Sequence, residues 1–143
     1  MILQNARGFK KRYLLMPLAI LLAGGIFWFS RITPFSESII KKIPLSNLAV
    51  LYVTEGDAGA TTAWSYRFYL YDAAKSEGDF AASIKKGTKP FLITSDKDTV
   101  INVDNGNLSL SVHGTVYFYH SNASYRLSSG VYSVPVYLQA SPY

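Results

Sequence analysis

The sequence predicts a mainly β protein in which an N-terminal transmembrane helix precedes a small antiparallel β-sheet or sandwich domain with one short helix. Three observations support this fold class. Residues 14–29 form an apolar run without a charge, residues 48–143 contain short strand-like runs between turn residues, and one segment carries helix-capping signals. The predicted order is a basic flank (1–12), a membrane anchor (13–32), a connector (33–47) and a β-domain (48–143).

The apolar run is nearly long enough to cross a bilayer. As a helix, its 16 residues cover about 24 Å, and extension to residues 13–32 approaches the roughly 30 Å hydrocarbon core. Aromatic residues at both ends are typical of membrane interfaces, a proline in the first turn costs little, and a terminal arginine can reach the headgroups. The residues expected to serve the anchor are Tyr13, Pro17, Gly24, Gly25, Trp28 and Arg31.

Basic residues precede the apolar run, namely Arg7, Lys10, Lys11 and Arg12. The positive-inside bias therefore predicts a single-pass protein of the plasma (inner) membrane, with a cytoplasmic N-terminus and a periplasmic or extracellular C-terminal domain. The lipid bilayer is then one expected partner. Two alternatives are a cleavable signal peptide, cut near Gly25, and a buried core helix.

The charge is concentrated at the front of the chain. The total is +5, with a net +6 over residues 1–42 and −1 over residues 43–143. Because the basic residues surround the apolar run and not the domain, they indicate membrane topology, and we expect no nucleic-acid partner. With no cysteine and two histidines, we also expect no metal and no other cofactor.

Strand-like runs rich in β-branched and aromatic residues fill the rest of the chain, at 48–54, 61–71, 90–94, 99–103, 108–112, 115–120 and 130–138. Within the predicted connector (33–47), Thr33-Pro34 and Ile43-Pro44 bracket a mixed polar stretch and are expected to be extended breaks. A two-turn helix is predicted over 79–86, with Asp79 as N-cap and Gly87 as the residue that ends it.

The second half of the domain has the clearest turn signals. Residues 104–107 (Asp-Asn-Gly-Asn) predict a type I′ hairpin, and His113-Gly114 predicts a second tight turn. The strands at 99–103, 108–112 and 115–120 should therefore form an antiparallel meander. A polar stretch over 121–129 precedes the last strand, which Pro135 should break or place at a sheet edge.

Catalytic and metal-binding patterns are weak. His113 and His120 should lie about 20 Å apart along a strand, too far to share a metal. The acids at 96 and 98 do not match a calcium-binding loop and are better explained as turn residues. There is no nucleophile elbow and no phosphate-binding glycine loop. We therefore expect no enzyme activity and assign no catalytic residue.

Tyrosine is abundant, with 11 residues, and many lie near the C-terminus. Cross-strand packing explains most of them, but tyrosines on a short edge strand also suit contact with another protein or a glycan. The residues expected to contact a protein partner are Tyr119, Tyr125, Tyr132 and Tyr137.

Two segments resemble known sequences. The turn at 56–62 (GDAGATT) leads into an aromatic strand, and 105–108 (NGNL) precedes 116–119 (VYFY). This arrangement resembles that of uncharacterised bacterial membrane-anchored proteins with a small β-domain. The resemblance covers roughly residues 48–120. It implies one N-terminal spanning helix and, as in some immunity-like relatives, a role in protection against a toxin; it implies no catalytic residues.

Three functions are consistent with these observations. The first is a membrane-anchored protein-binding module, in its sharpest form a toxin-immunity protein whose tether raises its effective concentration. The second is an envelope hydrolase or glycan-binding domain, which requires Glu55, Asp57 and Asp72 to gather near Trp64. The third is a structural subunit that associates through its spanning helix, where Gly24 and Gly25 permit close packing.

Overall fold

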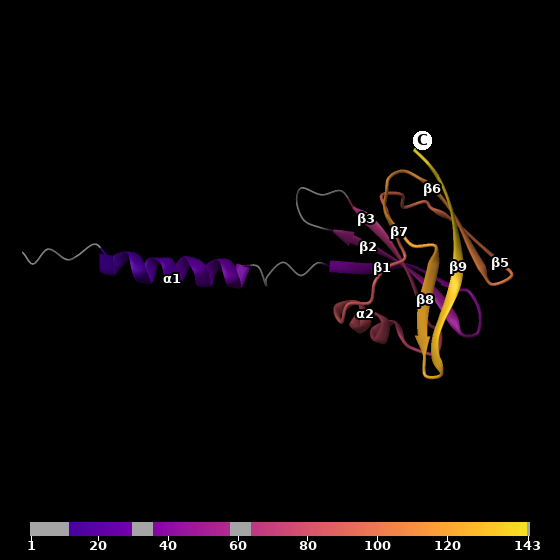
Figure 1. The fold of residues 1–143 in the computed structure, drawn as a ribbon, viewed down its shortest axis with the longest axis horizontal. Helices are drawn as coiled ribbons and strands as arrows, with labels where there is room; N and C mark the ends of the chain where they lie inside the picture. Colours follow the sequence, from indigo (N-terminus) through magenta and orange to yellow (C-terminus); the bar gives the residue numbers. More distant parts are fainter. Residues whose placement is uncertain (1–11, 30–35, 58–63, 143) are drawn as a thin grey trace, which may run out of the picture. The chain divides into compact units, whose positions relative to one another are not determined.

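The computed structural model describes residues 12–29, 36–57 and 64–142 (Figure 1). The chain divides into two compact units, Met1–Pro34 and Phe35–Tyr143. The first contains helix α1 (Arg12–Phe29), and the second contains helix α2 (Glu77–Lys85) and all nine strands of the described residues. The predicted mainly β domain with one short helix is therefore confirmed.

Helix α1 covers most of the predicted anchor and is 18 residues long. Pro17 lies in its interior and not in its first turn, because the helix begins at Arg12. The side chains described in α1, those of residues 16–25, are exposed, and a Cβ added at Gly24 or Gly25 would meet no atom within 4 Å. Within the described residues, no helix combines the length and the apolar character that a membrane crossing requires.

Several residues expected to act in the anchor or in topology lie outside the described part of the chain. They are Arg7, Lys10, Lys11 and Arg31, together with the side chains of Arg12, Tyr13 and Trp28. The same holds for residues 58–62 of the segment that carries the family resemblance. Predictions made for these residues stay predictions.

The domain contains a five-stranded antiparallel sheet with the order β1-β2-β3-β4-β7. Its strands are β1 (Ser36–Pro44), β2 (Ala49–Asp57), β3 (Ser65–Asp72), β4 (Leu92–Thr94) and β7 (Val116–Tyr119). Strand β1 occupies most of the predicted connector over 33–47, so that prediction is wrong for residues 36–44. Pro44 is the last residue of this strand, which pairs with β2 from Ser36↔Asp57 to Pro44↔Val50 around one bulge.

The second sheet has four strands in the order β5-β6-β9-β8. They are β5 (Val100–Asp104), β6 (Asn107–His113), β9 (Gly130–Ser141) and β8 (Asn122–Leu127). Strands β6 and β9 pair in parallel, so this sheet is mixed, whereas the sequence predicted an antiparallel one. The polar stretch expected between strands supplies β8, which forms a hairpin with β9.

The two sheets enclose the main hydrophobic core. Alternate residues of β2 and β3 meet alternate residues of β6 and the inner faces of β8 and β9, which is the pattern of a β-sandwich. The buried members from the central strands are Leu51, Val53, Tyr66, Phe68, Leu70, Leu108, Leu110 and Val112. Burial of each such side chain contributes about 1.5–3 kcal/mol to folding.

Helix α2 covers part of the outer face of the five-stranded sheet. Its buried residue, Phe80, stacks on Tyr52 at a ring-centroid distance of 4.1 Å and contacts Tyr69 edge-on. The helix begins two residues earlier than predicted, because Ser76 is the N-cap. The predicted cap, Asp79, is the third helical residue and completes a capping box with Ser76.

The first turn of the second half was predicted correctly, but the tight turn expected at His113-Gly114 and the strand order were not. Asn105 and Gly106 have φ values of 48° and 78°, as the predicted type I′ hairpin between β5 and β6 requires. The predicted meander is wrong, because the chain leaves the four-stranded sheet at Gly114 and β7 pairs with β4 in the other sheet.

Pro135 lies at a change of partner within β9, and β9 is not an edge strand. Before this residue β9 pairs with β8, up to Asn122↔Pro135. After it β9 pairs with β6, beginning at Leu108↔Val136. A proline has no N–H to donate, so it fits the point at which one ladder ends and the next begins.

Candidate functional site

The four tyrosines predicted to contact a partner fall into two pairs. Tyr125 and Tyr132 are cross-strand neighbours near the β8–β9 turn, and their rings stack at a centroid distance of 5.8 Å. The hydroxyl of Tyr119 donates to the backbone carbonyl of Val136, which precedes the exposed Tyr137. The two tyrosines of β9 are five residues apart, or about 16 Å along the strand, so the four do not form one compact site.

The most exposed group of consecutive aromatic residues in the domain lies on β7. Tyr117, Phe118 and Tyr119 are 54%, 44% and 36% exposed, and β7 is the last strand of its sheet. Two of these residues, Tyr117 and Phe118, were not among the predicted contacts. The sequence contains a signal for them, because three consecutive aromatic residues must occupy both faces of a strand, and an edge strand leaves part of them uncovered.

A cavity of about 200 Å³ borders the end of β7. Phe118 and His120 line it together with Lys89 and Phe91, which come from the segment before β4, and with residues of β3 and β8. Strand β4 is only three residues long, and directly before it the Phe91 N–H donates to the Phe68 carbonyl of β3 at 2.9 Å. The cavity is smaller than the roughly 300–1,000 Å³ of sites for drug-sized ligands.

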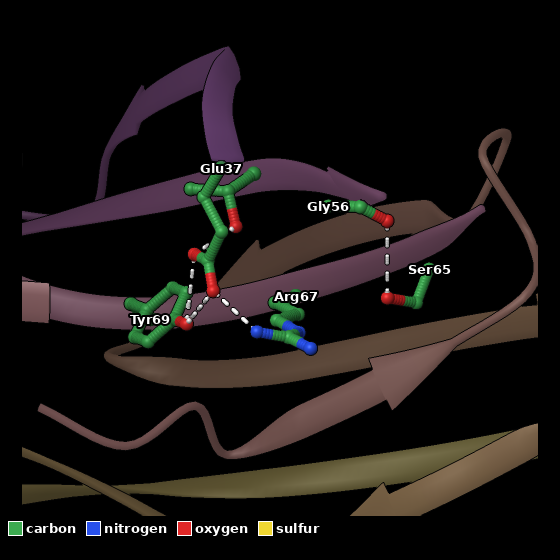
Figure 2. Close-up of polar contacts among 6 residues, drawn as sticks. Glu37, Gly56, Ser65, Arg67 and Tyr69 are labelled. Atoms are coloured by element: carbon green, nitrogen blue, oxygen red, sulfur yellow. Dashed lines mark hydrogen bonds and ion pairs between the residues drawn. The ribbon is translucent and has the colours of Figure 1, made fainter. Parts of the chain in front are cut away.

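A buried polar cluster joins β1 to the rest of the sheet (Figure 2). The carboxylate of Glu37 pairs with the Arg67 guanidinium and accepts hydrogen bonds from Thr54 Oγ1 at 2.9 Å and from the Tyr69 hydroxyl at 3.0 Å. The Glu37 side chain is 6% exposed and that of Arg67 22%. Burial, followed by the nearby Glu37 carboxylate, raises the pKa of Tyr69, so this hydroxyl stays a donor at neutral pH.

This cluster was missed by sequence reasoning, which treated Glu37 as part of the connector. The four side chains are directed toward one another, so the cluster has the form of a structural tie between strands. Its contribution to the candidate site is positional, because it fixes β1 on β2 and β3.

The acids required for a hydrolase do not gather. The Tyr66 hydroxyl donates to Glu55 at 3.0 Å near one end of β3, and burial raises the pKa of Tyr66. Asp72 pairs with Ala49 at the other end, six strand residues or about 20 Å away. There Asp72 accepts a hydrogen bond from the backbone N–H of Ala74. Glu55, Asp57 and Asp72 therefore do not form one acidic cluster near Trp64.

Asp96 acts as a turn residue, as predicted. Its two carboxylate oxygens accept hydrogen bonds from the backbone N–H groups of Asp98 and His113, at 2.9 and 2.7 Å. In the part of the chain that the structure describes, no three residues of the metal-ligating types lie together in a group that could hold an ion. The His113 ring pairs with the Ser141 hydroxyl at 2.9 Å, at an exposed end of the β6–β9 ladder.

Comparison with known proteins identifies no family for this chain. No family model matches the chain, and no curated protein and no solved structure is similar to it.

Proposed function

We propose that the chain is a single-pass membrane protein whose β-domain, held in the periplasm or outside the cell, is a protein-binding module. The observation that carries this proposal is the run of three exposed aromatic side chains on edge strand β7. Aromatic residues are enriched in protein interfaces because they bury a large area at a small cost in side-chain entropy. Tyr137, 61% exposed, lies on β9 directly after Val136, whose carbonyl accepts the hydrogen bond from the Tyr119 hydroxyl. We call Tyr117, Phe118, Tyr119 and Tyr137 the aromatic surface.

The anchoring part of the proposal rests on the sequence of residues 13–32, which extends beyond the described helix. Helix α1 alone has a length of about 27 Å, and Met16, Ile20 and Leu21 are among its exposed apolar side chains. If this helix lies in the bilayer, the membrane restricts the module to one plane and raises its effective concentration toward a partner that arrives there. A toxin-immunity protein is the specific form of this function that we propose.

Site-specific crosslinking in the protein's own cells tests the binding function. A photoreactive phenylalanine analogue replaces Tyr117 or Tyr137 in the full chain, and we expect a discrete adduct of defined mass from both positions. Val131 is the control, because it is also exposed on β9 but lies at the β8–β9 turn, away from the aromatic surface. Equal adducts from all three positions, or none from any, would overturn the proposed binding surface.

The location is tested separately. We expect the full chain to stay with membranes during carbonate extraction, and a phosphatase fused after Tyr143 to be active in a bacterial host. Release into the carbonate supernatant would contradict the anchor, and an inactive fusion would contradict the orientation.

A further inference from the structure

We propose that β7 accepts an extended segment of the partner protein as an added strand, and that an acidic side chain of this segment enters the cavity beside Lys89 and His120. The inference rests on the proposed binding function and deepens it by naming how the partner docks and which side chain it contributes. Two independent features support it, the free backbone edge of β7 and the charge of the cavity.

The backbone edge of β7 is open on the side away from β4. The N–H of His120 donates to the Phe91 carbonyl at 2.8 Å, and Phe118 is opposite Ile93 in the same ladder. The ladder has a register shift at Tyr117, and beyond it the Ser95 N–H donates to the Thr115 carbonyl at 3.0 Å. Because backbone groups alternate in direction along an antiparallel strand, those of Tyr119, next to His120, and of Val116, next to Thr115, face away from β4. These N–H and C=O groups can pair with an added strand, as in other cases of peptide recognition by strand addition.

Among the edge strands of the described domain, β7 is the one without a charged residue. Lys41 and Lys42 lie in β1, Asp104 in β5 and Arg126 in β8. Charged side chains on edges discourage the pairing of further strands. Strand β7 combines an uncharged edge with three exposed aromatic residues, which give an incoming strand both backbone partners and apolar contact area.

The cavity determines the chemistry of the incoming side chain. Its ionisable lining residues are Lys89 and His120, and the remaining polar ones are Asn122 and Ser124, so the lining contains no carboxylate. A volume of about 200 Å³ suits one side chain. Since Phe118 and His120 belong to β7 and the residue after it, a side chain from the neighbouring added strand is within cross-strand reach. An aspartate or glutamate complements this lining in charge.

A linked-peptide experiment tests both parts. A nonapeptide of alternating threonine and valine with a central glutamate is joined to the C-terminus of the full chain, in detergent solution, by a 20-residue glycine–serine linker. This linker spans about 25 Å on average and gives a local concentration of about millimolar, so weak pairing is detected. The measurement is amide hydrogen exchange of Val116 and Tyr119 by NMR, with the chain carrying the linker alone as reference.

We expect the glutamate peptide to slow exchange of both amides by about tenfold or more, and a matched peptide with central lysine to have a smaller effect. Lys89→Glu should reverse this preference. Val116→Pro removes an edge-facing N–H and should abolish protection at Tyr119, whereas Val116→Ala keeps that N–H and should retain it.

Unchanged exchange with either peptide overturns strand addition, and equal protection by both overturns the acidic side chain. Protection that grows with chain concentration in the reference chain assigns the edge to a second copy and also overturns the proposal. If crosslinks still form at Tyr117 and Tyr137 in these cases, the binding function stands and only the docking mode is wrong.

Discussion

Glu37 and Arg67 form an ion pair that connects the first strand of the five-stranded sheet to the third, across β2 (Figure 2). The pair is largely shielded from water, and Thr54 and Tyr69 supply further hydrogen bonds to the same carboxylate. It therefore explains why a segment bounded by prolines and containing a charged residue belongs to the sheet. The first strand is held by polar contacts on the outer face as well as by its ladder with β2.

Loss of this carboxylate should destabilise the domain. Glu37→Gln removes the buried negative charge that pairs with the Arg67 guanidinium, and we expect the free energy of unfolding to fall by about 2–3 kcal/mol in urea titrations. The matched control is Glu77→Gln, which breaks the exposed Lys42–Glu77 pair and should leave stability unchanged within error. Similar losses from the two variants would show that Glu37 does not tie β1 to the sheet.

The chain passes from the four-stranded to the five-stranded sheet at Gly114, and a side chain at this position should lower the free energy of unfolding. Its φ is +151°, and an added Cβ would lie 2.8 Å from Ser95 Oγ, which accepts a hydrogen bond from the Thr115 N–H. We expect Gly114→Ala to lower the midpoint of urea unfolding, with a loss of about 2 kcal/mol. The control is Gly87→Ala, at φ +101° with open space around it. Its loss of unfolding free energy should be smaller than that of Gly114→Ala by about 1 kcal/mol. Equal losses in the two variants would mean that the close contact between the added Cβ and Ser95 does not lower stability.

The N-cap of α2 can be tested in the same way. Ser76 Oγ accepts from the Asp79 N–H, and we expect Ser76→Ala to cost about 1 kcal/mol. Ser83→Ala is the control, because the Ser83 hydroxyl donates to the Phe80 carbonyl within the helix and caps nothing. Equal effects of the two variants in thermal unfolding would contradict the capping role.

The capping box of Ser76 and Asp79 should make the stability of the domain depend on pH in the acidic range. Hydrogen bonds from the Ser76 side chain and backbone lower the pKa of Asp79 below its usual 3.8. The stabilisation is present above that value and is lost as the pH falls through the lowered pKa. We therefore expect the stability difference between the wild type and Ser76→Ala to shrink below about pH 4. A difference that is constant down to pH 2 would show that the Asp79 carboxylate plays no part.

Alkaline pH should weaken the domain. Burial raises the pKa of Tyr69 above its usual 10.0 and, to a lesser degree, that of Tyr66. The protonated forms are therefore favoured in the folded state, so the stabilisation is complete below pH 10 and declines as the pH rises toward the raised values. Tyr69→Phe should flatten the loss of stability above pH 10, measured by urea unfolding at fixed pH. An unchanged slope would assign the alkaline loss to other groups.

The sequence predicted local features well where neighbouring residues decide them. The type I′ turn depends on Asn105 and Gly106 adopting positive φ, and both residues favour that conformation whatever surrounds them. The short helix followed from capping residues and from one apolar face, although its first residue was placed too late. The exposure of Tyr137 and Tyr132 was also anticipated, but without a fold their separation along β9 was not.

Features that depend on distant segments were not predictable in this way. The partner of β7 is β4, more than twenty residues earlier, and β9 pairs with both β8 and β6. Nothing in a single strand specifies which other strand pairs with it, because ladder hydrogen bonds join backbone groups that all residues share. The edge position of β7, on which the proposed site depends, is a consequence of that pairing.

The sequence by itself determined that this chain has an apolar N-terminal helix and a β-rich domain, because periodicity and turn chemistry act over a few residues. Only the tertiary structure decided that Glu37 is buried beside Arg67, that β1 belongs to the sheet, and that three aromatic residues of β7 lie at an open edge. Burial and edge position arise from the packing of segments far apart in the chain, and the free energy of that packing is a property of the whole domain.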